Sequence, residues 1–319
     1  MGGYLVRQLV AAAGGLIGLS LIVFLFLRIM PGSTTTMLLG SDVSNSPEQV
    51  AELRHQLGLD RPIPVQYLRW LGDLVRGQLG KSLFTGRSVW SEVTARLPTT
   101  FELSVLALGL SLLVGIPVGV ASAVWRDSAA DQALRTASIV GLAVPNFWLG
   151  TMVLVFGARW FGWIPPAVYV SPTSNLSRNL QQFVIPAAVL GLALAASLAR
   201  MSRSTVLEVL GEDYVRTARA KGLAGRNVLR RHALPNSMIP VLTLFGVQVG
   251  YVVAGSVVVE SVFSLPGLGR LLLDSIGHKD YPLAQGIVLL YGALIILVNL
   301  LVDFGYSVLD PRVRLGARG

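Results

Sequence analysis

A strongly basic polar segment between two apolar stretches limits the folds open to this chain. Residues 200–231 hold seven Arg and one Lys against three acidic side chains. The flanking segments 183–198 and 238–259 are almost wholly apolar. A membrane protein keeps short basic loops of this kind on the cytoplasmic side of the bilayer. The segment therefore predicts a cytoplasmic loop between two membrane-spanning helices.

The composition fits a membrane protein rather than a water-soluble one. Of 319 residues, 53% are hydrophobic and 13% are charged, which is too apolar for an ordinary soluble domain. The chain has no cysteine, which excludes disulfides and thiolate metal sites, and its three histidines lie far apart without metal-type spacing. The net charge of +9 could indicate nucleic acid binding. Most of the excess falls in segments expected on one side of a membrane, so we expect no nucleic acid partner.

Six apolar segments predict six membrane-spanning helices, at residues 9–30, 104–125, 136–157, 183–198, 238–259 and 283–308. No cleavage site follows the first segment, so we expect an uncleaved helix rather than a signal peptide. If both termini are cytoplasmic, the inner segments hold 14 Lys and Arg residues and the longer outer segments hold 11. This asymmetry supports that orientation. Arg28 and Asp303 lie within the spans, and Glu102 lies at the edge of the second, so all three are counted as intramembrane charges.

Residues 31–99 predict a small extracytoplasmic helical insertion after the first span. A capping signature at residues 46–49 starts one helix, which we expect to end near Gly58. A second helix is expected to begin at Pro64. Its predicted packing face consists of Val65, Leu68, Leu71 and Val75.

Gly80-Lys81-Ser82 resembles the end of a phosphate-binding loop, but we expect no nucleotide site there. The first glycine of such a loop would fall at position 75, which is Val75. No buried strand precedes the segment. It is also expected outside the membrane, where ATP is scarce.

The basic loop itself has a helical pattern. A short helix is predicted from Tyr214 to Lys221, because two acidic residues favour its N-terminus and Gly222 follows where it should stop. A second helical run, from Arg226 to Leu234, is expected to end at Pro235. Tyr214, Val215 and Ala218 are expected to share one face of the first helix, with the arginines on the other.

This loop resembles the cytoplasmic signature of ABC importer permeases, which reads E-A-A, three residues, G, nine residues, I-x-L-P. The aligned positions here are Arg216-Thr217-Ala218, Gly222, His232 and Leu234-Pro235. Ala, Gly and Leu-Pro match, whereas Arg, Thr and His replace Glu, Ala and Ile. The version Asp213-Tyr-Val-Arg-Thr-Ala-Arg-Ala-Lys-Gly222 is similar to that of the dipeptide, oligopeptide and nickel branch. A basic loop that only follows the positive-inside rule is the alternative.

The resemblance implies that the first helix of the loop docks into a partner ATPase subunit and transmits its closure. The implied coupling residues are Asp213, Tyr214, Val215, Arg216, Thr217, Ala218, Arg219, Ala220, Lys221, Gly222, Leu234 and Pro235. It also implies an all-α polytopic protein of the type I ABC importer fold with six transmembrane helices. The expected parts are the N-terminus and first helix (1–30), the insertion (31–99) and a core permease domain (100–319) with the cytoplasmic loop 203–236.

Polar and proline residues within the apolar segments are candidates for the translocation pathway or its gate. Pro145 should kink the third span, and the adjacent Asn146 amide needs a polar partner or a water-filled cavity. A pathway-lining kink and a packing kink both remain open there. After the fifth span, residues 260–270 resemble the outer gate helix of the family, with a surface re-entrant turn as the alternative. The full set of pathway or gate candidates is Pro145, Asn146, Phe147, Gln248, Glu260 and Phe263.

The sequence contains no recognisable catalytic set, so we expect a transport subunit rather than an enzyme. The resemblance implies a multi-pass permease in the inner membrane of a prokaryote that imports short peptides. Its implied partners are a second related permease, two ATPase subunits that bind ATP and Mg²⁺, an extracytoplasmic solute-binding protein and the lipid bilayer; no cofactor is expected in this chain. A nickel or other small-solute importer has the same pattern. An ion-coupled secondary transporter and a non-transporting scaffold or sensor are alternatives of other classes.

Overall fold

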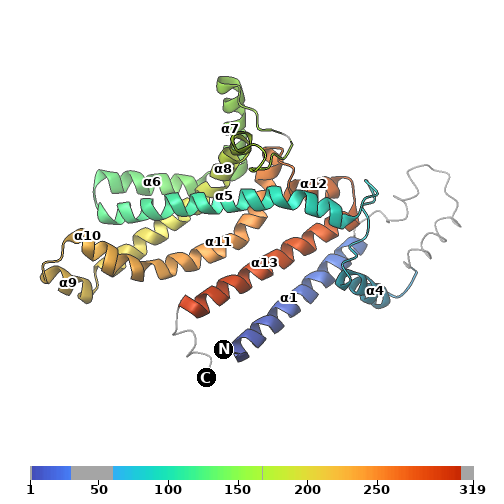
Figure 1. Ribbon diagram of the computed structural model, residues 1–319, viewed down its shortest axis with the longest axis horizontal. Coiled ribbons are helices and arrows are strands. Elements are labelled where there is room, and N and C mark those ends of the chain that lie inside the picture. The colour runs from blue at the N-terminus through green and yellow to red at the C-terminus, as the bar shows by residue number, and fades with distance from the viewer. Residues whose placement is uncertain (1, 30–59, 167, 310–319) are drawn as a thin grey trace. The chain divides into compact units, whose positions relative to one another are not determined.

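The computed structural model describes residues 2–29, 60–166 and 168–309, and these are mostly helical (Figure 1). The chain divides into two compact units. One comprises Met1–Leu97 with Leu271–Gly319, and the other comprises Pro98–Arg270. Two helices pass from one unit to the other, namely α5 (Val89–Val124) and α12 (Leu268–Gly277). The helix predicted to end near Gly58 lies outside the described residues.

Within the described residues, five helices are long and apolar enough to cross a membrane. The count becomes six if α6 (Ala129–Ala143) and α7 (Asn146–Phe161) are treated as one broken span. These helices account for all six apolar segments of the sequence. The multi-pass helical fold is therefore confirmed, although the third span differs from the expected kinked helix.

The first unit is built around α1 (Gly2–Ile29) and α13 (Tyr281–Leu309), which lie side by side (Figure 1). The two helices approach closely at Gly292, where an added Cβ would overlap the side chain of Leu19. Inside a membrane, burying apolar side chains between helices gains little, because lipid tails are equally apolar. Helices there associate through close packing, which small residues permit. The pairing of α1 and α13 therefore depends on Gly292.

Helix α4 (Ile63–Val75) packs on α1 through aromatic side chains rather than through the predicted aliphatic face. Phe24 contacts Tyr67 at 5.2 Å and Trp70 at 5.5 Å between ring centroids, and the Tyr67 hydroxyl lies 2.8 Å from that of Ser20. The predicted face is wrong, because Leu68 and Val75 are exposed. Aromatic rings give more contact area per residue than the aliphatic side chains, and Tyr67 also carries a hydroxyl for Ser20.

The segment that resembles a phosphate loop has a structural role within the same unit. The Ser82 hydroxyl donates to Asp280, and the amides of Leu83 and Phe84 donate to the same carboxylate at 3.1 and 3.3 Å. The loop amides thus bind the Asp280 carboxylate instead of a phosphate group. These hydrogen bonds tie the loop to the start of α13.

The second unit is organised around α8 (Leu176–Leu210), which packs against α5, α6 and α11 (Leu234–Val262). Gly115 and Gly119 of α5 face the carbonyl oxygens of Ala195 and Ala199, so a side chain at either glycine would overlap the α8 backbone. The second span therefore presents a face of small residues that lets α5 and α8 pack closely. The core between these helices includes Leu103, Ala107, Phe183, Leu190, Val252 and Phe263.

The third span is broken rather than kinked. Helices α6 and α7 meet at an angle of 98°, with Val144 and Pro145 both in extended conformations between them. Proline disfavours the helical conformation of the residue before it, so Val144 leaves the helix as well as Pro145. Two consecutive extended residues redirect the chain, which a single lost hydrogen bond would not do.

Candidate functional site

The predicted docking helix of the basic loop is present as α9 (Asp213–Ala220). It ends at Lys221 and Gly222, and Gly222 has a φ of +80°. The Gly222 amide donates to the Arg219 carbonyl at 2.9 Å, which closes the last turn. Glycine adopts this left-handed conformation without the steric cost of a Cβ atom. The predicted stop at Gly222 is confirmed.

One face of α9 is anchored in a small apolar cluster. Val215 and Ala218 are buried against Val228, with Val209 and Leu210 from the end of α8 completing the cluster. Helix α9 is therefore fixed to both neighbouring segments of the loop and cannot move without them.

Tyr214 does not share the buried face, contrary to expectation. Its side chain is 42% exposed, and its hydroxyl accepts a hydrogen bond from Asn236 Nδ2 at 2.8 Å. A tyrosine can lie along a surface with its hydroxyl in a polar contact, so burial of its ring is not needed. The contact connects α9 to the first turn of α11.

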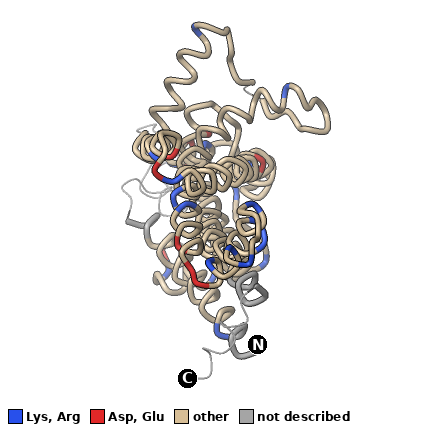
Figure 2. Tube along the Cα trace, turned by 90° about the vertical axis from the view of Figure 1, so that its left-hand side faces the viewer, with Lys and Arg blue, Asp and Glu red and all other residues tan. Residues whose placement is uncertain are grey.

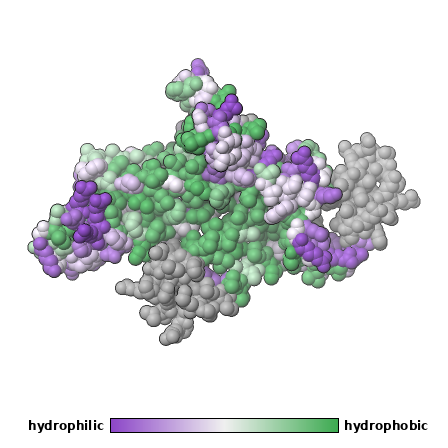
Figure 3. Space-filling view, viewed as in Figure 1, coloured by the Kyte–Doolittle hydropathy of each residue, from purple (hydrophilic) through white to green (hydrophobic). Residues whose placement is uncertain are grey.

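The outer face of α9 carries an excess of positive charge. Its exposed positions are Asp213, Arg216, Thr217, Arg219, Ala220 and Lys221. Among the basic side chains of this face, and counting described residues alone, only Arg216 has a carboxylate nearby, that of Asp213 at 3.4 Å, and both side chains are largely solvated. Figure 2 faces the end of the unit where α9 and α10 lie and shows basic positions gathered there, and Figure 3 shows this end as hydrophilic beside apolar helices. Such a surface is complementary to an acidic partner surface.

The sequence predicted that the second helical run of the loop ends at Pro235, but the run continues past this residue. Helix α10 (Gly225–Val228) continues through a π-helical turn, η1 (Leu229–Ala233), directly into α11. Proline lacks an amide hydrogen, and it is tolerated in the first turn of α11 because that amide has no α-helical partner to lose after a π-turn. Leu234 is half-buried and Pro235 is exposed. The loop is thus joined to α11 without a break.

The candidates at the α6–α7 break lie together on the surface of the second unit. Pro145 is the residue before α7, Asn146 begins it, and Phe147 is 57% exposed. The Asn146 amide has no hydrogen-bond partner among the described residues. Further along α7, Gly150 faces Phe263, where an added Cβ would lie 3.1 Å from the ring.

Gln248 and Phe263 are buried between helices. Gln248 Nε2 donates to the Leu194 carbonyl of α8 at 3.1 Å, and its Oε1 is buried without a partner in the described part of the chain. Phe263 contacts Trp163 edge to face at 6.2 Å. Both side chains therefore join α11 to neighbouring segments in this conformation.

Glu260 lies in the last turn of α11, which extends beyond the predicted end of the fifth span at residue 259, and it is fully buried. Its carboxylate accepts hydrogen bonds from the Thr100 hydroxyl at 2.7 Å and from the amides of Gly269 at 2.7 Å and Arg270 at 3.1 Å. The Thr100 hydroxyl accepts in turn from the Leu268 amide. A carboxylate at the first turn of α12 satisfies amides that the helix leaves unpaired.

The glycines after Glu260 make this arrangement possible. A side chain at Gly267 would overlap the Glu260 carboxylate, and one at Gly269 would overlap the backbone of Val257. The segment predicted as a gate helix is thus held at its N-terminus by a buried acid. Thr100 was not recognised in the sequence, since no local pattern links it to a residue 160 positions away.

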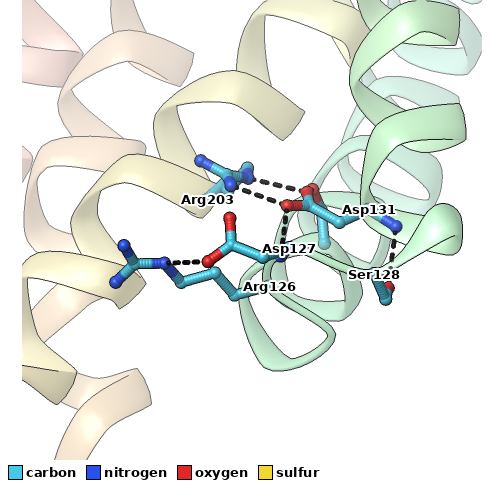
Figure 4. A network of polar contacts seen from close by, with 6 residues as sticks. Arg126, Asp127, Ser128, Asp131 and Arg203 are labelled. Carbon is cyan, nitrogen blue, oxygen red and sulfur yellow. Dashed lines mark hydrogen bonds and ion pairs between the residues drawn. The ribbon is translucent and has the colours of Figure 1, made fainter.

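Asp131 and Arg203 form a buried ion pair between α6 and α8 (Figure 4). Asp131 accepts from Arg203 Nε at 2.9 Å and Nη2 at 2.8 Å, and also from the Ser122 hydroxyl and the Asp127 amide. A bidentate pair of this kind fixes the orientation of both side chains. Ser128 is the sequence signal for the start of α6, because its side chain caps the helix by accepting from the Asp131 amide. This signal could have placed Asp131 in the first turn of a helix. This helix begins at Ala129, within the segment expected to be a loop.

Glu102 has polar partners of its own. It accepts from the Tyr169 hydroxyl at 2.9 Å and from the Asn179 amide group. Burial raises the pKa of Tyr169, and the hydrogen bond to Glu102 acts in the same direction. Tyr169 therefore stays a neutral donor, and the segment between α7 and α8 is attached to α5 and α8 through this acid.

Comparison with known proteins places this architecture among transport proteins. The profile described as "binding-protein-dependent transport system inner membrane component" matches residues 115–315, and its N-terminal companion matches residues 1–104. The chain is 40% identical to the di/tripeptide transport system permease DppB of Pseudomonas aeruginosa, with 98% of each chain covered. It is 39% identical to the dipeptide permease DppB of Escherichia coli K12 over 98% of each chain. It is also 39% identical to the probable peptide ABC transporter permease y4tP of Sinorhizobium fredii, over 98% of this chain and all of that one.

Two solved structures are similar in fold. An inward-facing form of the MetNI methionine ABC transporter matches with a TM-score of 0.53 and 17% identity, over 66% of this chain and 93% of the other. An amino acid ABC transporter crystallised with histidines matches with a TM-score of 0.50 and 18% identity, over 67% and 92% of the two chains. At this identity the similarity concerns the arrangement of helices, and it agrees with the fold expected from the sequence.

Proposed function

Because this chain belongs to the family of binding-protein-dependent transport system inner membrane components, we propose that it is the membrane-spanning permease subunit of an ATP-driven importer of short peptides. The relatives that match it from end to end are named for peptide, dipeptide or di/tripeptide transport. In such an importer the permease forms the pathway, and separate ATPase subunits bind ATP and Mg²⁺. The expected companions are a second related permease, two ATPase subunits and an external solute-binding protein.

The construction of α9 is the observation that carries the coupling role. The helix presents Arg216, Arg219 and Lys221 to solvent while Val215 and Ala218 anchor it in the loop. An ATPase groove lined by acidic side chains would be complementary to that basic face. A ligand can shift a conformational equilibrium only by its difference in affinity for the two states, and ATP supplies that difference through the ATPase subunits.

The anchored helix would pass ATPase closure to the membrane helices. Helix α9 is fixed to the end of α8 by the apolar cluster and to α11 through Tyr214 and Asn236. A displacement of α9 therefore acts on two long helices together. The expected result is a change between outward-open and inward-open arrangements of the pathway.

Uptake into proteoliposomes that contain the complete assembly tests this proposal. We expect ATP on the side of the membrane that carries the ATPase subunits to drive transport of a labelled dipeptide toward that side. The solute-binding protein must be present on the other side. The same vesicles should accumulate labelled nickel no faster than vesicles without ATP. Nickel uptake without peptide uptake would show that the importer carries nickel rather than peptides. Peptide uptake that needs an ion gradient and no ATP would instead support the secondary transporter.

A further inference from the structure

A pocket with an unusual lining lies between α5, α6 and α8 of the second unit. Its volume is about 480 Å³, and each helix contributes one side of its lining. The polar lining consists of Arg135, Arg200, Arg203, Ser122, Ser138 and Ser204. No carboxylate belongs to the lining.

The charge of the pocket is only partly compensated. Asp131 neutralises Arg203 by the bidentate pair described above. In the part of the chain that the structure describes, no carboxylate lies within 4.0 Å of Arg135 or Arg200, and both side chains are exposed. The Ser122 and Ser138 hydroxyls donate to Asp131 and to the Leu134 carbonyl, which leaves the Ser204 hydroxyl beside the two guanidinium groups. This set favours a phosphate group, because guanidinium forms paired hydrogen bonds with phosphate oxygens.

The walls of the pocket are apolar and lie at the end of long apolar helices. Val118, Ile139 and Leu207 line it together with the charged groups. Val118 is six residues before the end of α5, or about 9 Å along the helix axis, and the exposed Trp125 follows that end. Tryptophan is enriched at membrane interfaces, so we expect the pocket to lie near the level where lipid headgroups meet acyl chains.

Close packing of α5 on α8 forms the pocket floor. A side chain at Gly119 would overlap the Ala199 carbonyl and the Ser202 side chain, so these two helices touch backbone to backbone there. Arg135, Ser138 and Ile139 lie on one face of α6, and Arg200, Arg203, Ser204 and Leu207 lie on one face of α8, by their helical spacing. The helix geometry thus gathers cationic, hydroxyl and apolar groups around one opening.

We propose that this pocket binds the phosphate group of an anionic phospholipid, with an acyl chain along the apolar wall. A basic pocket between membrane helices on the side expected to be cytoplasmic has the chemistry that recognises such headgroups. A solvated basic surface would satisfy the positive-inside rule without a pocket or an apolar wall. The inference does not depend on which solute the permease carries.

Lipid retention measured by native mass spectrometry tests the proposal. The full-length chain is purified with its co-expressed partner subunits, washed in detergent and supplied with equal amounts of phosphatidylglycerol and phosphatidylcholine. We expect preferential retention of phosphatidylglycerol. The double substitution Arg135→Gln/Arg200→Gln should reduce that retention at least about tenfold, because it removes both charge-assisted contacts to the phosphate group. Arg135→Lys/Arg200→Lys should keep most of it.

The matched control is Arg226→Gln/Arg231→Gln, which removes the same charge from the basic loop on the same side. It should leave retention unchanged. Equal losses in both double variants, or a loss in neither, would overturn the proposal. So would binding of inorganic phosphate without retention of phosphatidylglycerol, which would make this a site for free anions. Loss of a partner subunit with unchanged lipid would make it a protein contact.

A second variant guards against misfolding of the first. Ile139→Trp changes an exposed wall position and narrows the opening without altering charge. It should also lower phosphatidylglycerol retention while the complex elutes as a single species. Full retention in a folded Ile139→Trp complex would contradict the placement of the acyl chain.

Discussion

Gly222 sets the length of α9 through a backbone conformation that other residues adopt at a cost. Its φ of +80° lies in the left-handed region, and nothing else surrounds the position of a Cβ atom within 4 Å. A β-branched residue would therefore meet strain of about 1–2 kcal/mol and no steric clash with neighbours. A substitution at Gly222 therefore changes the end of α9 without disturbing the packing of neighbouring side chains.

We predict that Gly222→Val uncouples ATP hydrolysis from transport. The strain should displace the end of α9, so solute uptake should fall about tenfold, which corresponds to about 1.4 kcal/mol, while membrane insertion stays intact and hydrolysis continues. Uptake and phosphate release are measured in the same proteoliposomes. Gly225→Val is the control, because Gly225 has an equally open surrounding and no positive φ. Normal uptake by the Gly222→Val protein would count against the docking role of α9.

Single residues were predictable where the determinants are local in sequence. Gly222, Val215 and Ala218 follow from helical periodicity and C-terminal capping, and all three lie as expected. Tyr214 was placed wrongly because its exposure depends on a hydrogen bond to Asn236, 22 residues later. Glu260 was placed outside the fifth helix because its partner, Thr100, comes from a different helix altogether.

At the level of elements, close packing of α5 against α8 gives a direct test. Gly119→Val would place atoms within van der Waals overlap of the Ala199 carbonyl and the Ser202 side chain. Overpacking of this kind destabilises by about 1–3 kcal/mol, so we expect a lower melting temperature and less protein in the membrane. Gly109→Val changes the same helix at a position with open surroundings and should have little effect. Melting is measured by the intrinsic fluorescence of the detergent-solubilised complex.

The two prolines show why element boundaries could be predicted only in part. Pro145 indicated an interruption in the third span, yet the angle of 98° arises because Val144 also leaves the helix. Pro235 indicated a helix end, yet the chain continues because a π-turn precedes it. Proline changes the hydrogen bonding in both places, but the packing of the flanking helices decides what the chain does next.

At the scale of the whole molecule, orientation in the membrane follows from charge alone and can be measured. The natural sequence has no cysteine, so single cysteines can be introduced without removing others. We expect Arg219→Cys in α9 to react with an impermeant maleimide only in inside-out vesicles. Arg178→Cys, at the start of α8, should react in intact cells. The reverse pattern would place α9 outside and rule out its coupling to a cytoplasmic ATPase.

The fold class was predictable because membrane spans need long apolar segments, which are visible in any single sequence. The division into two units was not, since it joins the start of the chain to residues 271–319. Long-range grouping of this kind depends on which helices meet, as α1 and α13 do, and apolar periodicity does not specify helix partners.

The continuous helix from Gly225 to Val262 has a mechanical consequence. It is 38 residues long, or about 57 Å at the usual rise, and it runs without interruption from the loop to the buried Glu260. A tilt imposed beside α9 is therefore carried toward its far end, and the π-turn η1 and Pro240 are the two points at which this helix bends most easily. That end holds the first turn of α12 through Glu260. Events on one side of the membrane would thus reach the opposite side within one element, as leverage rather than as a relay of separate contacts.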